Sequence, residues 1–498
     1  MGALSERPFP PGAYDVVVIG TGPGGLQTAY SLAKGGVECA VLSRDPAPGG
    51  MFRRFPVFQR LISWTKPDAP VERGTREYEA YDHNSLLGEE RDHRALAPEF
   101  MDRAFDLPAR HEMESALAEF AARGGVQARY DCEWLATRRT EEGFVLETAD
   151  GEYSCRVCVF ALGATERWTP PIPGLDAAPH YADTLTPESY AGKRVFVIGK
   201  RNSGFELGQG LLPWARQLVL ASPRRVDTAV LAFSPLRLRY LQPFDEYVRG
   251  GSGSYVVDVS IQRVERNADG YRIHATGTTW DGKLVFDSDE VIVATGFRAP
   301  LRDLPALGVA TVSDGRLPAQ TPYWESVSVP GIYFAGNVTQ ASPGLRKHGS
   351  SSSSSSVNGF RYNARVLAEH IAEKHFGRDR KRPELRRDDV VPYLLSELAH
   401  APELRIQKGY LARVVSVDET HGIRDDGIVP LADFIDRAGP DACAAAVEYD
   451  GGGAIVPVVY VRRGGRLSEH VLPPHPMHAF DTDAHRSELE ARVAPLLG

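Results

Sequence analysis

The sequence contains few cysteines, five in 498 residues: Cys39, Cys132, Cys155, Cys158 and Cys443. So few thiols over such a length cannot form the disulfide framework of a small secreted protein, and they fit a reducing compartment. The start of the chain also lacks a signal-peptide pattern, because its first apolar stretch, Val16 to Ile19, runs directly into glycines. We therefore expect a cytoplasmic protein.

Long apolar runs and an excess of basic charge are lacking as well. No stretch approaches the roughly 18 apolar residues of a membrane-spanning helix. Lys and Arg number 57 against 65 Asp and Glu, a net charge of −8. We expect neither a membrane nor a nucleic-acid partner. The histidines lack the spacing of metal ligands, so we expect no metal site.

Two strand–glycine loop–helix patterns are present, far apart in the chain. The first comprises a strand, an amphipathic run and a second strand, at 14–20, 26–34 and 38–42. The second repeats this order at 194–199, 205–212 and 217–220. Both are the beginnings of βαβ units, which predict parallel sheets covered by helices on both faces. We also expect helices over about 111–123 and 359–375.

The first glycine loop is Gly20-Thr21-Gly22-Pro23-Gly24-Gly25. In such a loop the first glycine permits a tight turn, the second lets the backbone approach a pyrophosphate, and the last allows close helix–strand packing. The helix N-terminus then presents unpaired N–H groups and a positive dipole end.

The strand after this loop ends unusually. An acid that binds ribose hydroxyls is expected there, but Leu42 is followed by Ser43-Arg44-Asp45. Either Ser43 supplies a weaker hydrogen bond or Asp45 reaches back. The following Gly50-Met51 bend predicts a second place where backbone approaches the bound dinucleotide.

The second glycine loop is Gly199-Lys200-Arg201-Asn202-Ser203-Gly204, with Arg201 in place of the middle glycine. Its Cβ would crowd a pyrophosphate, whereas its guanidinium could add a cation to the phosphates. After the next strand, Arg224 and Arg225 fit the 2′-phosphate of NADPH; a solvated charged turn is the alternative.

Taken together, these features resemble the FAD/NAD(P)-dependent oxidoreductases with two dinucleotide folds, and within them the flavin-containing monooxygenases. Ala161-Leu162-Gly163-Ala164 and Ala294-Thr295-Gly296-Phe297 resemble the signatures where the chain crosses between domains. The stretch 330–337 resembles the late FAD signature, with Asn337 replacing the usual acid. His180 and the later Pro187, Glu188, Gly192 and Lys193 match the tail of the monooxygenase fingerprint. The segments 55–87, 358–362 and 407–410 are similar to FAD-dependent oxidoreductase domain-containing proteins.

The resemblance implies an α/β fold with two Rossmann-like dinucleotide-binding domains, for FAD and NADPH, plus a small C-terminal α+β domain. The expected FAD domain is 1–170 with 288–378, the NAD(P)H domain 171–287, the linker 379–389 and the accessory domain 390–498. The expected FAD contacts are Gly20, Gly22, Pro23, Gly24, Gly25, Ser43, Arg44, Gly50, Met51, Ala161, Gly163, Gly336 and Asn337. The expected NADPH contacts are Gly199, Lys200, Arg201, Asn202, Ser203, Arg224, Arg225, Thr295 and Gly296.

Reduced flavin can pass its electrons to a disulfide, to a small acceptor or to oxygen. Cys155 and Cys158 have C-x-x-C spacing, but on a strand they would face opposite sides, so we interpret them as core residues. This favours an NADPH-consuming monooxygenase, which oxygenates a nitrogen, sulfur or carbonyl carbon of a small organic substrate through a flavin C4a-(hydro)peroxide.

Within the aromatic-rich stretch 51–110, Trp64, His83 and Asn84 are the candidates beside the flavin ring. Asn84 would hydrogen-bond the peroxide and His83 would relay a proton. Two alternatives stay open: an NAD(P)H-dependent flavin reductase or oxidase acting on a quinone-like or thiol acceptor, and a binding protein that holds FAD structurally. Self-association is also left open. The serine run 350–356 is either a flexible loop or part of the flavin site.

Overall fold

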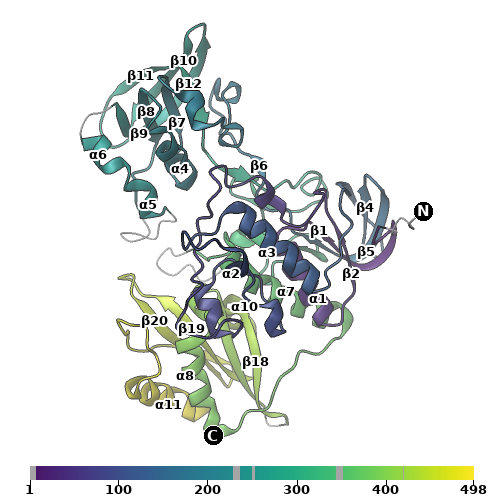
Figure 1. Ribbon diagram of the computed structural model, residues 1–498. Coiled ribbons are helices and arrows are strands. Elements are labelled where there is room, and N and C mark those ends of the chain that lie inside the picture. Colours follow the sequence, from purple (N-terminus) through teal and green to yellow (C-terminus); the bar gives the residue numbers. More distant parts are fainter. Residues whose placement is uncertain (1–6, 228–235, 250–252, 344–350, 419, 498) are drawn as a thin grey trace. The chain divides into compact units, whose positions relative to one another are not determined.

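The computed structural model describes residues 7–227, 236–249, 253–343, 351–418 and 420–497 (Figure 1). These residues form two compact units. The first unit comprises residues up to 54, 59–164 and 299–498, and the second comprises 55–58 and 165–298. In the described part of the chain, no helix has both the length and the apolarity that a bilayer crossing requires.

The first unit is built on a six-stranded sheet in the order β2-β1-β5-β4-β3, with β16 also paired to β5. Its parallel strands are β1 (Gly12–Ile19), β2 (Cys39–Leu42), β5 (Gly151–Phe160) and β16 (Ile332–Phe334). The antiparallel strands are β3 (Trp134–Arg139) and β4 (Phe144–Thr148). Parallel pairing is therefore confirmed for the part of the sheet that carries the glycine loop.

Helices α1 (Pro23–Lys34) and α7 (Val357–Phe376) pack against each other on one face of this sheet (Figure 1). Their apolar side chains meet Val16 and Val18 of β1, while Val17 faces the other layer with Phe160 and Phe334. The alternation follows from the two-residue period of a strand. Helix α3 (Arg110–Arg123) confirms the helix expected at 111–123.

The helices in and next to the aromatic-rich stretch 51–110 are short: η1 (Gly50–Arg53), η2 (Glu77–Tyr81), η3 (Arg91–His93) and α2 (Ala97–Phe100). A small β14–β15 pair (Thr311–Val312 and Leu317–Pro318) precedes β16. The helix η7 (Gly336–Ala341) follows it.

The C-terminal part of the first unit is a five-stranded antiparallel sheet with helices. The strands, in spatial order, are β18 (Gly422–Pro430), β17 (Leu411–Asp418), β19 (Asp441–Tyr449), β20 (Ile455–Arg463) and β21 (Arg466–Val471). The helices are η9 (Arg387–Asp389), α8 (Val390–His400), α9 (Pro402–Ile406), α10 (Leu431–Asp436) and α11 (Asp483–Leu497). Its apolar core is continuous with that of α7, since Leu394 and Leu398 of α8 share a cluster with Leu367.

The second unit has a six-stranded sheet in the order β11-β10-β9-β8-β7-β12. Its parallel strands are β7 (Arg194–Ile198), β8 (Gln217–Ser222), β9 (Ser254–Asn267) and β12 (Glu290–Val293); β10 (Gly270–Gly277) and β11 (Lys283–Ser288) are antiparallel. Its helices are η4 (Leu175–Ala177), η5 (Tyr181–Asp183), η6 (Pro187–Tyr190), α4 (Asn202–Leu211), α5 (Leu238–Leu241) and α6 (Phe244–Arg249). Strands β6 (Glu166–Arg167) and β13 (Phe297–Arg298) pair where the chain enters and leaves the unit. Two dinucleotide-type sheets and a C-terminal α+β part thus match the expected fold class.

Candidate functional site

Three glycine-containing turns meet beyond the carboxyl end of β1. A Cβ on Gly24 would lie 2.3 Å from Gly336 Cα, and a Cβ on Gly50 would lie 2.8 Å from Gly22 Cα. Backbone contacts backbone in both pairs, so a side chain does not fit there. A Cβ on Gly22 would instead find its nearest neighbour at 3.8 Å. The space beside Gly22 is a cradle that a side chain would fill and that suits a pyrophosphate.

The same loop shows the other features of a dinucleotide site. Gly20 has φ +111°, and Gly25 lies so close to Gly20 that a Cβ on it would be 1.9 Å from the Gly20 carbonyl oxygen. Helix α1 begins at Pro23, and no side chain caps its N-terminus. Its first backbone N–H groups are therefore left for a ligand in the cradle. The structure therefore brings together most of the expected FAD residues. They include Ala161, whose carbonyl oxygen would lie 2.6 Å from a Cβ on Gly20.

Ser43 lies at the end of β2, where the ribose-binding acid was expected, and is buried. Its Oγ accepts hydrogen bonds from the Thr21 hydroxyl (2.8 Å) and the Asp45 backbone N–H (3.2 Å). Both lone pairs of the hydroxyl are thus occupied, and Ser43 can only donate to a ligand. Arg44 is exposed and Met51 is half-buried in η1.

Around the late FAD signature, Gly336 has φ +76° and Gly163 has φ +63°. Thr339 Oγ1 donates to the Gly336 carbonyl oxygen at 2.7 Å. Asn337 is half-buried, and Gln340 Nε2 donates to its carbonyl oxygen at 3.0 Å. The turn after β16 is therefore stabilised by hydrogen bonds from its own side chains.

The second glycine loop has the same close packing between strand and helix. A Cβ on Gly204 would lie 2.1 Å from the Gly199 carbonyl oxygen, as Gly25 lies against Gly20. Lys200 is buried and its Nζ pairs with the Asp258 carboxylate of β9. The structure thus gives Lys200 a partner within the fold; its expected contact with NADPH stays a prediction. Arg201 is exposed at the N-cap of α4.

The other expected NADPH residues are placed as follows. Asn202 Oδ1 accepts from the Arg237 N–H at 3.0 Å, and Ser203 is half-buried. Thr295 Oγ1 donates to the Trp168 carbonyl oxygen at 2.6 Å. The Gly296 carbonyl oxygen lies 3.0 Å from His180 Nε2. These contacts tie the crossing strands together within the second unit.

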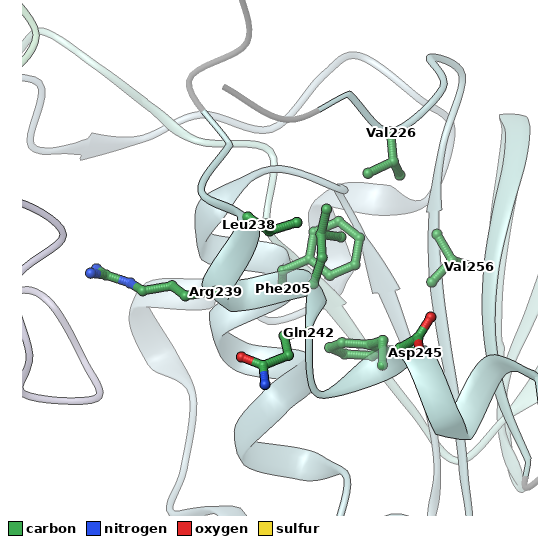
Figure 2. Close-up of a pocket in the computed structure, with 9 residues that line it drawn as sticks. Phe205, Val226, Leu238, Arg239, Gln242, Asp245 and Val256 are labelled. Atoms are coloured by element: carbon green, nitrogen blue, oxygen red, sulfur yellow. The ribbon is translucent and has the colours of Figure 1, made fainter. Parts of the chain in front are cut away.

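Arg224 and Arg225 are exposed, and neither pairs with a carboxylate among the residues that the structure describes. The next residue, Val226, lines a cavity of about 720 Å³ in the second unit (Figure 2). Figure 2 shows apolar side chains turned toward one another while Arg239 extends away from them. The lining residues are Phe205, Val226, Leu238, Arg239, Leu241, Gln242, Phe244, Asp245 and Val256.

Trp64, His83 and Asn84 lie together, as expected for one site. Thr65 and Asp82 form an isolated antiparallel bridge, and the Trp64 and His83 rings are 4.1 Å apart. Asn84, however, donates both amide hydrogens inside the protein, to the Ser63 carbonyl oxygen (3.1 Å) and to Thr65 Oγ1 (2.9 Å). These two hydrogen bonds show that Asn84 stabilises the turn; its expected place beside the flavin stays a prediction.

Cys155 and Cys158 do not face opposite sides of β5, which corrects the sequence-based interpretation. Their Sγ atoms are 3.3 Å apart, and both residues lie in the same core layer as Tyr153 and Phe160. The strict two-residue alternation is thus broken at Arg156. Burial raises the pKa of the Cys158 thiol well above its usual range. Cys158 is the ladder partner of Val17 in β1. Val17 precedes Gly20 by three residues, which is about 10 Å along the strand. Both cysteines remain core residues.

The sequence reasoning missed two features of the structure. The structure describes Ser351 to Ser356 of the serine run, and Ser350 lies outside the described residues. Ser354 is buried and hydrogen-bonded to Asn363 and Gln407. In α4, the Glu206 carboxylate accepts a 2.6 Å hydrogen bond from the Tyr181 hydroxyl, and burial raises its pKa to about 7.

Among the described residues, no cluster of three or more His, Cys, Asp or Glu could hold a metal.

Comparison with curated proteins gives two informative relatives. The chain is 29% identical to FAD-dependent oxidoreductase domain-containing protein 2 of Danio rerio over 229 residues, 44% of this chain and 32% of that protein. It is 24% identical to ferredoxin–NADP reductase of Saccharopolyspora erythraea over 311 residues, 60% of this chain and 78% of that protein. The chain thus spans about a third of the length of the first relative.

A solved structure and a family profile complete the comparison. The flavin-containing monooxygenase from Stenotrophomonas maltophilia shares the fold at 21% identity with a TM-score of 0.53, over 72% of this chain and 98% of that chain. The family described as pyridine nucleotide-disulphide oxidoreductase matches residues 17–336, from β1 through both glycine loops. These findings confirm the predicted fold class and the prediction of an oxidoreductase with FAD and a pyridine nucleotide. The chain belongs to the pyridine nucleotide-disulphide oxidoreductase family.

Proposed function

We propose that the chain is an NADPH-consuming, FAD-dependent monooxygenase acting on a nitrogen, a sulfur or a carbonyl carbon of a small organic substrate. The observation that carries this proposal is the backbone cradle at Gly22, which leaves room for a pyrophosphate beside the first turn of α1. The C-x-x-C pair lies in the core about 10 Å before that loop, which disfavours a disulfide as the electron acceptor.

FAD would be held mainly by backbone. The uncapped N–H groups at the start of α1 would face its phosphates, with Gly50 and Gly336 supplying close backbone walls. The Ser43 hydroxyl would donate to a ribose oxygen, because both its lone pairs are occupied. When bound, FAD supplies the chemistry of accepting a hydride from NADPH and passing electrons to oxygen.

NADPH would bind the second unit through a different set of residues. Arg224 and Arg225 are exposed without a carboxylate partner in the described structure, so they are available for a 2′-phosphate. The apolar cavity that begins at Val226 has the size of a small-molecule site and would receive the flat adenine. The ferredoxin–NADP reductase relative supports NADP over NAD.

At the reacting centre, His83 is the proposed proton donor and Trp64 the proposed wall that excludes water. The His83 ring packs on the Trp64 ring, which fixes its orientation. Imidazole is suited to this role because its ordinary pKa lies near neutrality. Asn84 acts one step away by holding Ser63 and Thr65 in place.

The second candidate is an NAD(P)H-dependent flavin reductase or oxidase, which the likeness to a ferredoxin–NADP reductase over 60% of the chain favours. The two are distinguished by following NADPH oxidation with oxygen, a quinone or a disulfide as the acceptor. A monooxygenase should oxidise NADPH with oxygen and faster when a suitable amine, sulfide or ketone is present. A reductase should respond to the quinone or disulfide and ignore those substrates.

A further inference from the structure

A continuous set of buried hydrogen bonds begins at Gln407, just after α9 in the C-terminal part of the first unit. Its Nε2 donates to Asn363 Oδ1 (2.7 Å) and Ser354 Oγ (2.9 Å), and its Oε1 accepts from the Ser353 backbone N–H (3.0 Å). The amide therefore holds both the turn before α7 and the second turn of α7 itself.

The hydrogen bonds continue to the flavin-site glycine. Asn363 Nδ2 donates to Thr339 Oγ1 at 3.0 Å, and Thr339 Oγ1 donates to the Gly336 carbonyl oxygen at 2.7 Å. Gly336 is the residue whose Cα would meet a Cβ on Gly24 at 2.3 Å. Three side chains thus connect the C-terminal part of the chain to the backbone of the glycine cradle.

Burial gives these bonds their importance. Gln407 and Thr339 are 0% exposed, and Ser354 and Asn363 are 1% exposed. A polar atom that loses its partner at such sites is not compensated by water, so the surrounding segments must shift to satisfy it. The segment that can shift here includes Gly336, whose φ of +76° is compatible with few side chains and is set by its local contacts.

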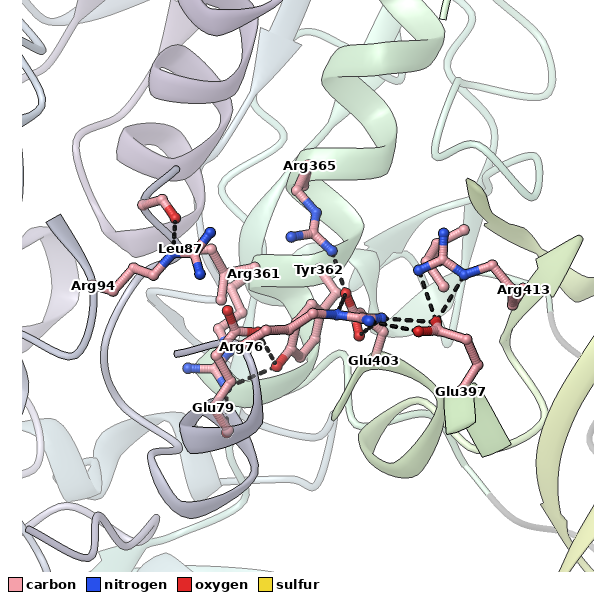
Figure 3. Close-up of polar contacts among 12 residues, drawn as sticks. Arg76, Glu79, Leu87, Arg94, Arg361, Tyr362, Arg365, Glu397, Glu403 and Arg413 are labelled. Carbon is pink, nitrogen blue, oxygen red and sulfur yellow. Dashed lines mark hydrogen bonds and ion pairs between the residues drawn. The ribbon is translucent and has the colours of Figure 1, made fainter. Parts of the chain in front are cut away.

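The position of Gln407 is itself fixed by ion pairs. Glu403 of α9 is buried and pairs with Arg76 at 2.9 Å and with Arg365 of α7, while Arg76 also pairs with Glu397 at 2.6 Å (Figure 3). Figure 3 shows Arg76 reaching between the two glutamates. Helix α9 is thereby anchored to α7 and to the segment before η2, so its end cannot move independently of them.

We propose that Gln407 is a positioning residue for the flavin site, through which the C-terminal part of the first unit holds the Gly336 loop in its FAD-binding position. The inference rests on the proposed function, because it takes the glycine cradle as the FAD site. It assigns a role in cofactor binding to the C-terminal part of the first unit, which lies beyond the family match that ends at Gly336.

The test is the dissociation constant for FAD of the full-length chain, measured by flavin fluorescence at a temperature where circular dichroism shows each variant folded. Gln407→Leu and Thr339→Val should each weaken FAD binding about tenfold or more. Thr339→Ser keeps the hydroxyl and should bind as the wild type does. Both changes break the same series of hydrogen bonds. The dissociation constant of the double variant should therefore rise less than the product of the two single-variant increases.

The matched control is Tyr393→Phe, which removes a 2.7 Å hydrogen bond to Asp425 in the same C-terminal part of the first unit and should leave FAD affinity within about twofold. If Gln407→Leu does not fold, Thr339→Val and Thr339→Ser test the same series of hydrogen bonds at its Gly336 end. Wild-type affinity in Gln407→Leu or Thr339→Val, or fully multiplicative effects in the double variant, would overturn the inference alone. A wild-type protein that binds no FAD would overturn the proposed function as well.

Discussion

Replacing Gly22 with alanine tests whether the first glycine loop holds FAD. Gly22 has φ −71° and ψ 177°, which alanine adopts without strain. The added Cβ would find its nearest neighbour, Gly50 Cα, at 3.8 Å, an ordinary van der Waals distance. The apoprotein should therefore keep its free energy of unfolding within about 0.5 kcal/mol.

The same methyl group would occupy the space through which a pyrophosphate approaches the backbone. We expect the dissociation constant for FAD to rise at least about 100-fold, equivalent to about 2.7 kcal/mol, and the purified protein to be colourless. Flavin fluorescence titration measures the affinity, and urea denaturation of the apoprotein measures the stability. Folding and cofactor binding are thus separated in one variant.

Two further glycines provide controls. Gly35→Ala, at the other end of α1 with φ −77° and neighbours at 3.4 Å or more, should keep both stability and FAD. Gly24→Ala should destabilise the fold itself, because its Cβ would lie 2.3 Å from Gly336 Cα. A yellow Gly22→Ala protein with wild-type affinity would refute the placement of FAD in this loop.

Three other predictions follow from the structure. Replacing Arg224 and Arg225 with alanine should raise the KM for NADPH about tenfold or more and leave that for NADH nearly unchanged; an unchanged ratio contradicts the assignment. Converting Cys155 and Cys158 to serine should leave NADPH-driven flavin reduction and oxygen uptake intact, since the pair is buried about 10 Å before the glycine loop; loss of electron transfer to every acceptor would show a redox role. The free energy of unfolding of the wild type should fall as the pH rises, and Glu206→Gln should abolish this fall. The folded pKa of about 7 exceeds the ordinary 4.5, so the wild type loses up to about 3 kcal/mol between these values, measured by urea denaturation at pH 5 and 8.

The βαβ units were predictable because their signals are local. Val16 to Ile19, the glycines and the run into Lys34 lie within one short segment, and the structure places β1 and α1 there. The antiparallel strands β3 and β4 were not foreseen as part of this sheet, since their pairing depends on neighbours rather than on their own pattern.

Several features of the site could not be predicted from local sequence. The break in alternation at Arg156, which brings two thiols to 3.3 Å, has no signature in the C-x-x-C spacing. Asn84 and Lys200 were assigned to ligands, but their partners in the fold, Thr65 and Asp258, are known only once strands are paired. Gln407 contacts Asn363 across 44 residues, a separation at which polar residues give no periodic signal.

The most direct test of the proposed function is the fate of molecular oxygen. Purified protein with FAD and NADPH is supplied with ¹⁸O₂ and a panel of amines, sulfides and ketones, and the products are analysed by mass spectrometry alongside NADPH and hydrogen peroxide. The proposal predicts that one or more substrates gain a single ¹⁸O atom in an amount that matches the NADPH consumed, with little peroxide. One hydrogen peroxide per NADPH with every substrate, and no labelled product, would contradict it.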